Sequence, residues 1–191
     1  MKSIILHTFT CLFFTLAIYA QKPTLVIGHE PKLTKVEEIQ SSFDQIEHIK
    51  QKINKDSEFI LFEGLPHVKW DSALLESELK EKNTITRYGF TFYQKTSVVN
   101  IEDTKKILSL IKSSDTLIEF RGYKKCGGFS PDFSLVYKNK DDEIEIHICF
   151  GCGEIKAYNG ETEVYCDITS KSEKSLREIL KNYNKQRPKK Q

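Results

Sequence analysis

The chain has 191 residues, with 29 Lys and Arg against 27 Asp and Glu and a formal net charge of +2 at pH 7. A balance this close to neutral does not favour nucleic acid or an anionic membrane surface as the main partner. The length corresponds to about one domain, which can bury a hydrophobic core without depending on disulfides or metals for its stability.

The N-terminus has the pattern of a secretory signal peptide. Residues 1–20 combine Lys2, an apolar run that begins at Ile4, and the small residue Ala20 before the polar Gln21. The run is short for a membrane span, and no later segment has the roughly 20 apolar residues that spanning needs. We therefore expect an exported protein, periplasmic or secreted, with no stable membrane association after cleavage. Lys2 is the only charged residue removed, so the remainder would carry a net charge of +1.

The spacing of apolar residues after this segment predicts alternating helices and strands. Apolar side chains three and four positions apart predict an amphipathic helix, and Asp71 and Asn100 are suitable N-caps for two further helices. Runs of strand-forming residues lie between them. Helices are predicted at 34–55, 71–79, 100–111 and 170–183, and strands at 58–62, 85–93 and 116–120.

The last third of the chain predicts a β-meander. Residues 133–138 and 143–150 alternate between apolar and polar, and Asn159–Gly160 favours a tight hairpin turn. A turn at this pair sets Lys156 opposite Glu163, which is a favourable pair of opposite charges. Strands gathered at one end of the chain predict an α+β fold with a mainly antiparallel sheet, a C-terminal β-meander and helices packed on one face.

We expect four parts in the chain. Residues 1–20 are the signal peptide, 21–57 an N-terminal segment with the amphipathic helix, 58–188 a single α+β domain, and 189–191 a basic tail. Five basic side chains crowd residues 181–191. We interpret them as a frayed, solvated terminus and not as a binding patch.

Strand pairing predicts one cluster of chemical groups. Pairing Lys138 with Glu143 sets Asp132 opposite Cys149, and alternation puts His147 on the same face. In a thiol-dependent or hydrolytic enzyme, Cys149 would be the nucleophile, His147 the base and Asp132 the residue that orients the base. The alternative is that His147 is an ordinary residue of a polar strand face and Asp132 a turn residue.

Four cysteines remain after removal of the signal peptide: Cys126, Cys149, Cys152 and Cys166. In an exported chain, an even number of cysteines favours disulfides. The hairpin at 159–160 places Cys166 opposite a neighbour of Cys152 in the sequence. It therefore predicts a Cys152–Cys166 disulfide and leaves Cys126 to pair with Cys149.

A metal site is a second interpretation of the cysteines. The segment Cys149–Gly153 resembles the CxxCG knuckle of rubredoxins and zinc ribbons, in which backbone amides turn toward the thiolates. Cys126 and Cys166 would complete a four-thiolate site, and His147 or Asp132 could substitute. The chain has no second CxxC. Apart from this zinc ion, we expect no cofactor.

A redox pair is the third interpretation of Cys149 and Cys152. Redox-active CxxC motifs of the thioredoxin type lie at a helix N-terminus, where the helix dipole lowers the thiol pKa. Here the motif follows one predicted strand and precedes another. The sequence therefore favours disulfides or metal over a reactive pair.

The loop FEGLPH, residues 62–67, is a second candidate site. It leaves a predicted strand and places Glu63 and His67 four residues apart in a loop, where functional residues concentrate. In the enzyme interpretation, His67 could also serve as the base and Cys126 as the nucleophile. The alternative is a Gly-Pro turn with exposed polar side chains.

Three segments, FEGLPH, KCGGFSPDF and ICFGCGEIK, together resemble the recurring motifs of a group of small exported bacterial proteins of uncharacterised function. The resemblance extends over residues 58–188. It implies that these three loops are defining features of the fold, and it implies no activity.

The function expected from the sequence is that of a non-catalytic binding or accessory protein with a structural cysteine cluster, whose partner is a small molecule or a protein. One alternative is a metal- or thiol-dependent enzyme centred on Cys149, His147 and Asp132. Another is an immunity or inhibitor protein directed against an exported toxin.

Overall fold

The computed structural model describes residues 25–27, 35–53, 58–69, 71–124, 128–138, 142–160 and 162–188. The expected signal peptide, Cys126 and the basic tail at 189–191 lie outside these ranges. Among the residues that are described, no helix is both long enough and apolar enough to cross a membrane.

The centre of the molecule is a seven-stranded sheet in which all neighbouring strands are antiparallel. Its order is β5 (Ser97–Val98), β2 (Phe59–Glu63), β7 (Phe133–Lys138), β8 (Glu143–Cys149), β9 (Glu154–Asn159), β10 (Thr162–Ile168) and β6 (Leu117–Glu119). Strands β7 to β10 are adjacent in both the chain and the sheet. The predicted α+β fold with a C-terminal meander is therefore confirmed.

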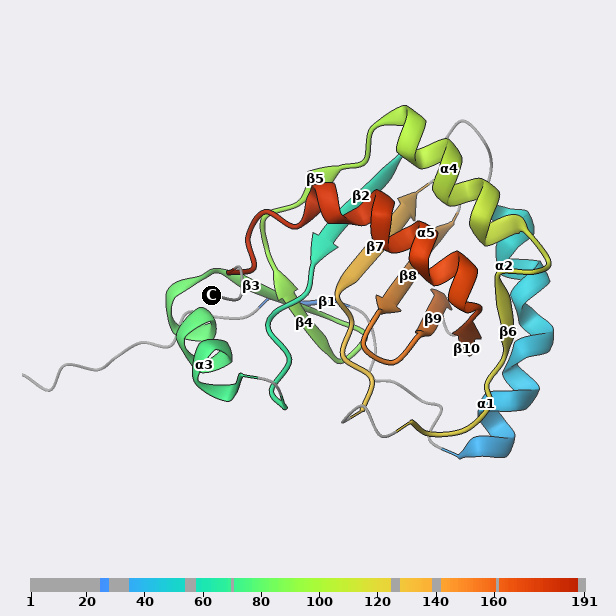
Figure 1. Cartoon of the computed structure of the whole chain (residues 1–191), viewed down its shortest axis with the longest axis horizontal. Helices are drawn as coiled ribbons and strands as arrows, with labels where there is room; N and C mark the ends of the chain where they lie inside the picture. The colour runs from blue at the N-terminus through green and yellow to red at the C-terminus, as the bar shows by residue number, and fades with distance from the viewer. Residues whose placement is uncertain are drawn as a thin grey trace, which may run out of the picture.

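Helices cover one face of this sheet, as predicted (Figure 1). Ile49 of α2 (Ile46–Lys52), Ile107 of α4 (Ile101–Lys112) and Leu176 of α5 (Ser170–Leu180) belong to one core. This core also contains the apolar residues that β7 to β10 direct toward the helices, such as Leu135 and Ile146. The alternation seen in the sequence thus separates a hydrophobic face from a polar one.

The remaining helices complete the edges of the molecule. A 3₁₀ turn, η1 (Phe43–Gln45), joins α1 (Val36–Ser42) to α2, and Ser42 Oγ accepts the edge amide of Tyr165 in β10 at 3.3 Å. The side chain of Asp71 caps α3 (Ser72–Glu81), and that of Asn100 caps α4. Both caps were predicted. A short 3₁₀ turn, η2 (Lys181–Tyr183), follows α5.

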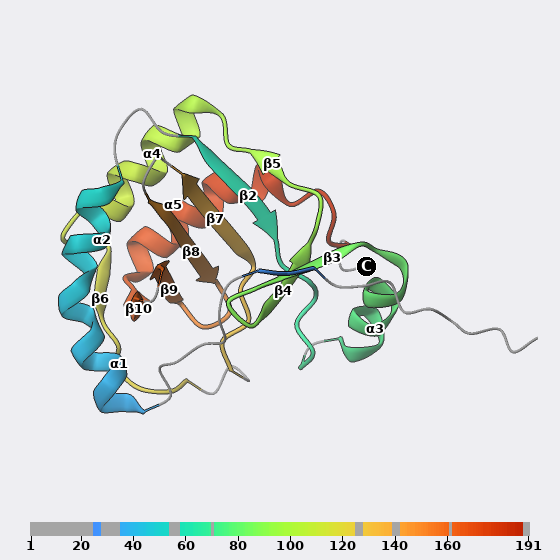
Figure 2. The same cartoon turned by 180° about the vertical axis from the view of Figure 1, so that it is seen from behind.

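The expected single strand at 85–93 is a hairpin. Strands β3 (Thr84–Arg87) and β4 (Phe90–Tyr93) pair with each other, and β1 (Leu25–Ile27) runs parallel to β3. Tyr88 and Gly89 have φ angles of 47° and 77°, and positive φ at both centres is typical of tight hairpins. Figure 2 shows this small sheet on the side of the large sheet away from α4 and α5.

The polar face of the large sheet is buried beneath this hairpin. Glu145 on β8 accepts hydrogen bonds from Arg87 Nε at 2.7 Å and from Ser134 Oγ at 2.6 Å. Lys156 Nζ donates to Glu163 at 2.9 Å and lies 4.5 Å from the centre of the Tyr165 ring. The charged residues of this face are therefore paired inside the protein and not solvated.

The register of β7 with β8 is as predicted, with Lys138 opposite Glu143 and Ser134 opposite His147. The predicted register of β9 with β10 is wrong by two residues. Asn159 pairs with Thr162, so the positive-φ turn begins at Gly160 (φ 57°) and not at Asn159. The side chain of Asn159 bonds to the Glu143 carbonyl at 3.3 Å, which holds this residue in the strand.

Candidate functional site

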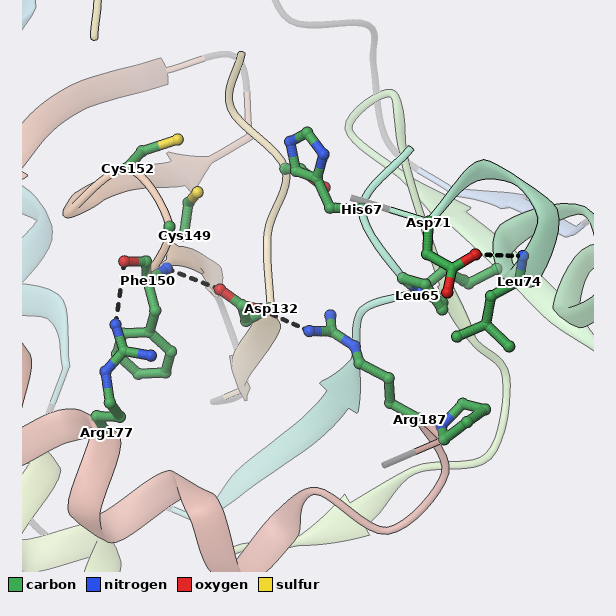
Figure 3. Close-up of a pocket in the computed structure, with 14 residues that line it drawn as sticks. Leu65, His67, Asp71, Leu74, Asp132, Cys149, Phe150, Cys152, Arg177 and Arg187 are labelled. Carbon is green, nitrogen blue, oxygen red and sulfur yellow. Dashed lines mark hydrogen bonds and ion pairs between the residues drawn. The ribbon is translucent and has the colours of Figure 1, made fainter. Parts of the chain in front are cut away.

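A pocket of about 230 Å³ lies where the three sequence motifs meet (Figure 3). Residues 65–67 come from the loop after β2, Ser130 and Asp132 from the segment before β7, and residues 149–152 from the end of β8 and the turn that follows it. The rest of the wall is formed by the start of α3, by Arg177 of α5 and by Arg187 and Pro188 of the C-terminal segment. The structure thus brings segments far apart in the sequence to one concave site.

The CxxC turn is held from both sides. Cys149 ends β8, and the amide of Gly153 donates to the Cys149 carbonyl at 3.0 Å, which closes the turn. Gly153 has a φ of 67°, a conformation that side chains other than glycine rarely adopt. Phe150 lies between Cys149 and Gly153 in the turn. Its amide donates to Asp132 Oδ2 at 2.7 Å, and Arg177 donates to its carbonyl at 3.1 Å.

The surroundings of Cys149 lower the pKa of its thiol. The largest contribution that lowers it is a hydrogen bond from the side chain of Cys152, and hydrogen bonds from the backbone of Ser130 and of Cys152 act in the same direction. Burial and the negative charge of Asp132 act in the opposite direction but are outweighed. Hydrogen bonds to a thiolate favour the charged form. The fold of the turn therefore favours ionisation of Cys149 without a helix dipole.

Cys152 completes a dithiol. Its Sγ lies 3.3 Å from the Gly128 carbonyl, and the residue is 6 % exposed. Residues separated by three positions in a tight turn have Cα atoms less than about 7 Å apart, which suits a disulfide. The two thiols therefore occupy one turn at the edge of one pocket.

Cys166 lies elsewhere. It faces Ile155 on β9 and is fully buried in the core beneath the helices, where burial raises its pKa to about 12. Cys149, Cys152 and Cys166 are all thiols, so the expected Cys152–Cys166 disulfide is not formed. That expectation came from the incorrect β9–β10 register. The expected Cys126–Cys149 pairing involves a residue outside the described ranges.

A metal centre is not assembled by the described residues, because no group of three or more His, Cys, Asp or Glu among them could hold an ion. Cys166 is in the helix-side core, away from the turn that carries Cys149 and Cys152. Cys126, the remaining expected ligand, is outside the part of the chain that the structure describes.

His147 does not line the pocket. Its Nε2 lies 2.6 Å from Glu145 Oε1, and its ring packs edge-on against Phe92 with centroids 5.0 Å apart. Burial lowers the pKa of His147, which favours the neutral ring. Of the three residues expected to form a catalytic cluster, the structure brings Cys149 and Asp132 to the pocket and places His147 beneath the β3–β4 hairpin.

Glu63 and His67 of the FEGLPH loop have separate roles. Glu63 is buried and accepts the backbone amides of Lys185, Gln186 and Arg187 at 3.0, 2.8 and 2.7 Å. His67 lines the pocket, and its Nδ1 accepts the Lys69 amide at 3.0 Å, which places the ring hydrogen on Nε2. The interpretation of this loop as a turn with exposed polar residues is therefore wrong for Glu63.

Gly64 explains why this loop contains a glycine. A Cβ atom at Gly64 would lie 1.9 Å from the Pro131 carbonyl oxygen, and the Gly64 amide donates to the Asp132 carbonyl at 2.8 Å. The loop after β2 and the segment before β7 are therefore in direct backbone contact. This contact sets the width of the pocket between His67 and Asp132.

Arg187 and Arg177 are functional candidates that sequence analysis missed. Arg187 donates from Nη1 to Asp132 Oδ1 at 2.6 Å and from Nε to the Gly64 carbonyl at 2.9 Å. Arg177 stacks over the Phe150 ring at 4.6 Å. The C-terminal segment up to Pro188 is thus fastened to the domain, and the expectation of a frayed end from residue 181 is wrong for residues 181–188. Only the clustering of basic residues signalled this segment in the sequence.

No protein-family model matches this chain, and neither the curated proteins nor the solved structures include one that is significantly similar to it. The resemblance of the three motifs to a group of exported proteins therefore stays a prediction. The function has to be argued from the geometry of the pocket.

Proposed function

We propose that the protein is an exported thiol-dependent protein whose Cys149 and Cys152 carry out thiol–disulfide exchange with a small molecule or peptide that enters the pocket. The observation that carries this proposal is the placement of two thiols, Cys149 and Cys152, in one turn at the pocket wall, where hydrogen bonds lower the pKa of Cys149. It favours the thiol-dependent alternative over a purely structural cysteine cluster.

The proposed exchange has two steps. The Cys149 thiolate attacks one sulfur of a substrate disulfide, which forms a mixed disulfide with Cys149 and releases the other half of the substrate as a thiolate. Deprotonated Cys152 then attacks Cys149 Sγ, which forms the Cys149–Cys152 disulfide and releases the second half. The substrate gains two electrons and the dithiol loses two. An external dithiol restores the reduced protein, or the reactions run in reverse to oxidise a dithiol.

The size of the pocket limits the substrate. Pockets for drug-sized ligands have volumes of roughly 300–1,000 Å³, and this one has about 230 Å³. It suits a small disulfide or a single disulfide-bearing side chain of a peptide. Cys149 and Cys152 are 1 % and 6 % exposed, so a reactant has to enter the pocket to reach them.

The proposal can be tested with a small aromatic disulfide that releases a coloured thiolate. The protein is used with Cys11→Ser and Cys126→Ser as background, because both cysteines are outside the described residues. We expect two coloured equivalents per protein and no mixed disulfide left, because Cys152 resolves it. Cys152→Ser should release one equivalent and retain the mixed disulfide on Cys149, whereas Cys149→Ser should react far more slowly. Equal rates for wild type and Cys149→Ser would overturn the proposal.

A further inference from the structure

The C-terminal strap, which we define as residues 184–188, reaches the CxxC turn through a single carboxylate. We propose, resting on the function above, that Arg187 is a positioning residue for Cys149, and that docking of the strap on Glu63 sets the reactivity of the dithiol by delivering Arg187 to Asp132.

The strap is anchored along its length. Both carboxylate oxygens of Glu63 are used by three successive backbone amides of the strap. Gln186 also donates from its side chain to the Lys95 carbonyl at 2.8 Å, and the hydroxyl of Tyr183, just before the strap, donates to Asp103 at 2.9 Å. Glu63 and the strap are more than 120 residues apart in sequence. Arg187 therefore approaches the pocket in one fixed position.

Asp132 connects the strap to the dithiol. Its Oδ1 accepts from Arg187, and its Oδ2 accepts the amide of Phe150, the residue directly after Cys149. The Asp132 amide also donates to the Ile148 carbonyl at 2.7 Å. A change at Arg187 is thus transmitted to the CxxC turn through two bonds to one carboxylate.

The charge of Asp132 opposes ionisation of Cys149. A carboxylate near a thiol raises the thiol pKa, and Asp132 has this effect on Cys149. The guanidinium of Arg187, 2.6 Å from Asp132 Oδ1, balances that charge while the strap is docked. When the strap is released, an unbalanced carboxylate would remain beside the thiol, and the thiolate would become less populated. Docking therefore favours the reactive form of Cys149.

The other charged groups around the turn are balanced without the strap. Arg177 of α5 is paired with Glu173 at 2.6 Å, and Asp71 at the start of α3 accepts the Leu74 amide at 2.9 Å. His67 accepts the Lys69 amide.

The carboxylate directly opposite Cys149 is also balanced without the strap. Glu154 of β9 pairs with Lys124 at 2.8 Å and accepts from the Tyr165 hydroxyl. None of the contacts of these groups involves the strap, so removal of Arg187 leaves them in place.

The test is the pH dependence of Cys149 alkylation, measured by peptide mass spectrometry in the full chain. Arg187→Gln should move the midpoint to higher pH and slow alkylation at pH 7 by about threefold to tenfold. Arg187→Lys should recover part of the loss, because the positive charge is kept. Lys185→Gln is the matched control, since it removes a charge from the same strap without contact to Asp132, and it should leave the midpoint unchanged.

A double variant shows whether Arg187 acts through Asp132. In Asp132→Asn the carbonyl oxygen of the amide can still accept from Phe150, but the charge is gone. Arg187→Gln should then have no effect on the midpoint in this background. An unchanged midpoint in the single Arg187→Gln variant, with an acidic Cys149 in wild type, would overturn this inference and leave the proposed function standing. An ordinary thiol midpoint near pH 8.5 in wild type would overturn the proposed function itself.

Discussion

The two ends of one face of strand β8 differ in how their polar groups are covered. Glu145 and His147 lie fully buried beneath the β3–β4 hairpin and bond to each other, and Glu145 also accepts from Arg87. Two residues after His147, Cys149 lines the pocket and is hydrogen-bonded by the turn. The alternation of the sequence places all three on one face. Only the segments that cover this face distinguish the buried network from the pocket.

Mutations in the buried network and mutations in the pocket should therefore have different consequences. Changes in the buried network should lower stability and leave the Cys149 thiol unaltered in the folded protein. Changes in the pocket should alter thiol chemistry with smaller effects on stability.

Removal of the central carboxylate of the network should have the largest effect. Glu145→Ala leaves Arg87 buried without its inner partner, and breaking a buried ion pair costs about 3–5 kcal/mol. Glu143→Ala is the matched control, because Glu143 also pairs with Arg87 but its side chain is 32 % exposed. It should cost about 0–1 kcal/mol. Urea unfolding measures both, and equal losses would contradict the distinction between inner and outer partner.

Acid should weaken the same network. Burial acts to raise the pKa of Glu145, but the hydrogen bond from His147 and the charge that His147 carries in acid, with the hydrogen bond and charge of Arg87, outweigh it and lower the pKa to about 2. The stabilisation is complete above the unfolded pKa of 4.5 and is lost as the pH falls toward about 2. The loss is on the order of 3 kcal/mol. Glu145→Gln should flatten this part of the pH–stability curve, and a curve as steep as that of wild type would contradict the assignment.

A methyl group at Gly64 tests the backbone contact that shapes the pocket. Gly64→Ala places a Cβ 1.9 Å from the Pro131 carbonyl oxygen, so the two loops have to separate. Overpacking of this kind costs about 1–3 kcal/mol. Gly151→Ala is the control, since its Cβ would meet nothing within 4 Å, and its stability should stay within about 0.5 kcal/mol of wild type. Thermal unfolding measures the stability of the two variants. Equal stability of Gly64→Ala and Gly151→Ala would contradict the tight contact at Gly64.

The meander shows how much of the fold a sequence can predict. Strict alternation in β7 and β8 predicted the two faces, because the side-chain period of a strand is two, and a four-residue loop between Lys138 and Glu143 predicted the register. The β9–β10 register was wrong because Asn159 stays in the strand through its bond to the Glu143 carbonyl. The β3–β4 turn was missed because Tyr88 adopts a positive φ, which is uncommon for a residue other than glycine.

The site was predictable only in part. The pocket contains Cys149, Cys152, Asp132 and His67, which were selected from the sequence, and Glu63 lies in the loop that carries His67. A reactive CxxC was the least favoured interpretation, because no helix dipole was available to lower a thiol pKa. The hydrogen bonds that lower the pKa of Cys149 come from Cys152 and from the backbone of Ser130, and no local sequence pattern reveals them. The position of Arg187 depends on the hydrogen bond between its backbone amide and Glu63, and the two residues are 124 positions apart in the sequence.

In the proposed function, Cys149 and Cys152 form one redox-active pair. The most direct measurement is to equilibrate the full chain in a small-molecule thiol–disulfide buffer of stepped composition, trap the thiols with acid and alkylation, and map the linked peptides. We expect a Cys149–Cys152 disulfide that forms at a single midpoint of the buffer series, while Cys166 remains a thiol throughout. A disulfide that joins Cys152 to Cys166, or two thiols that stay reduced at the oxidising end of the series, would contradict it.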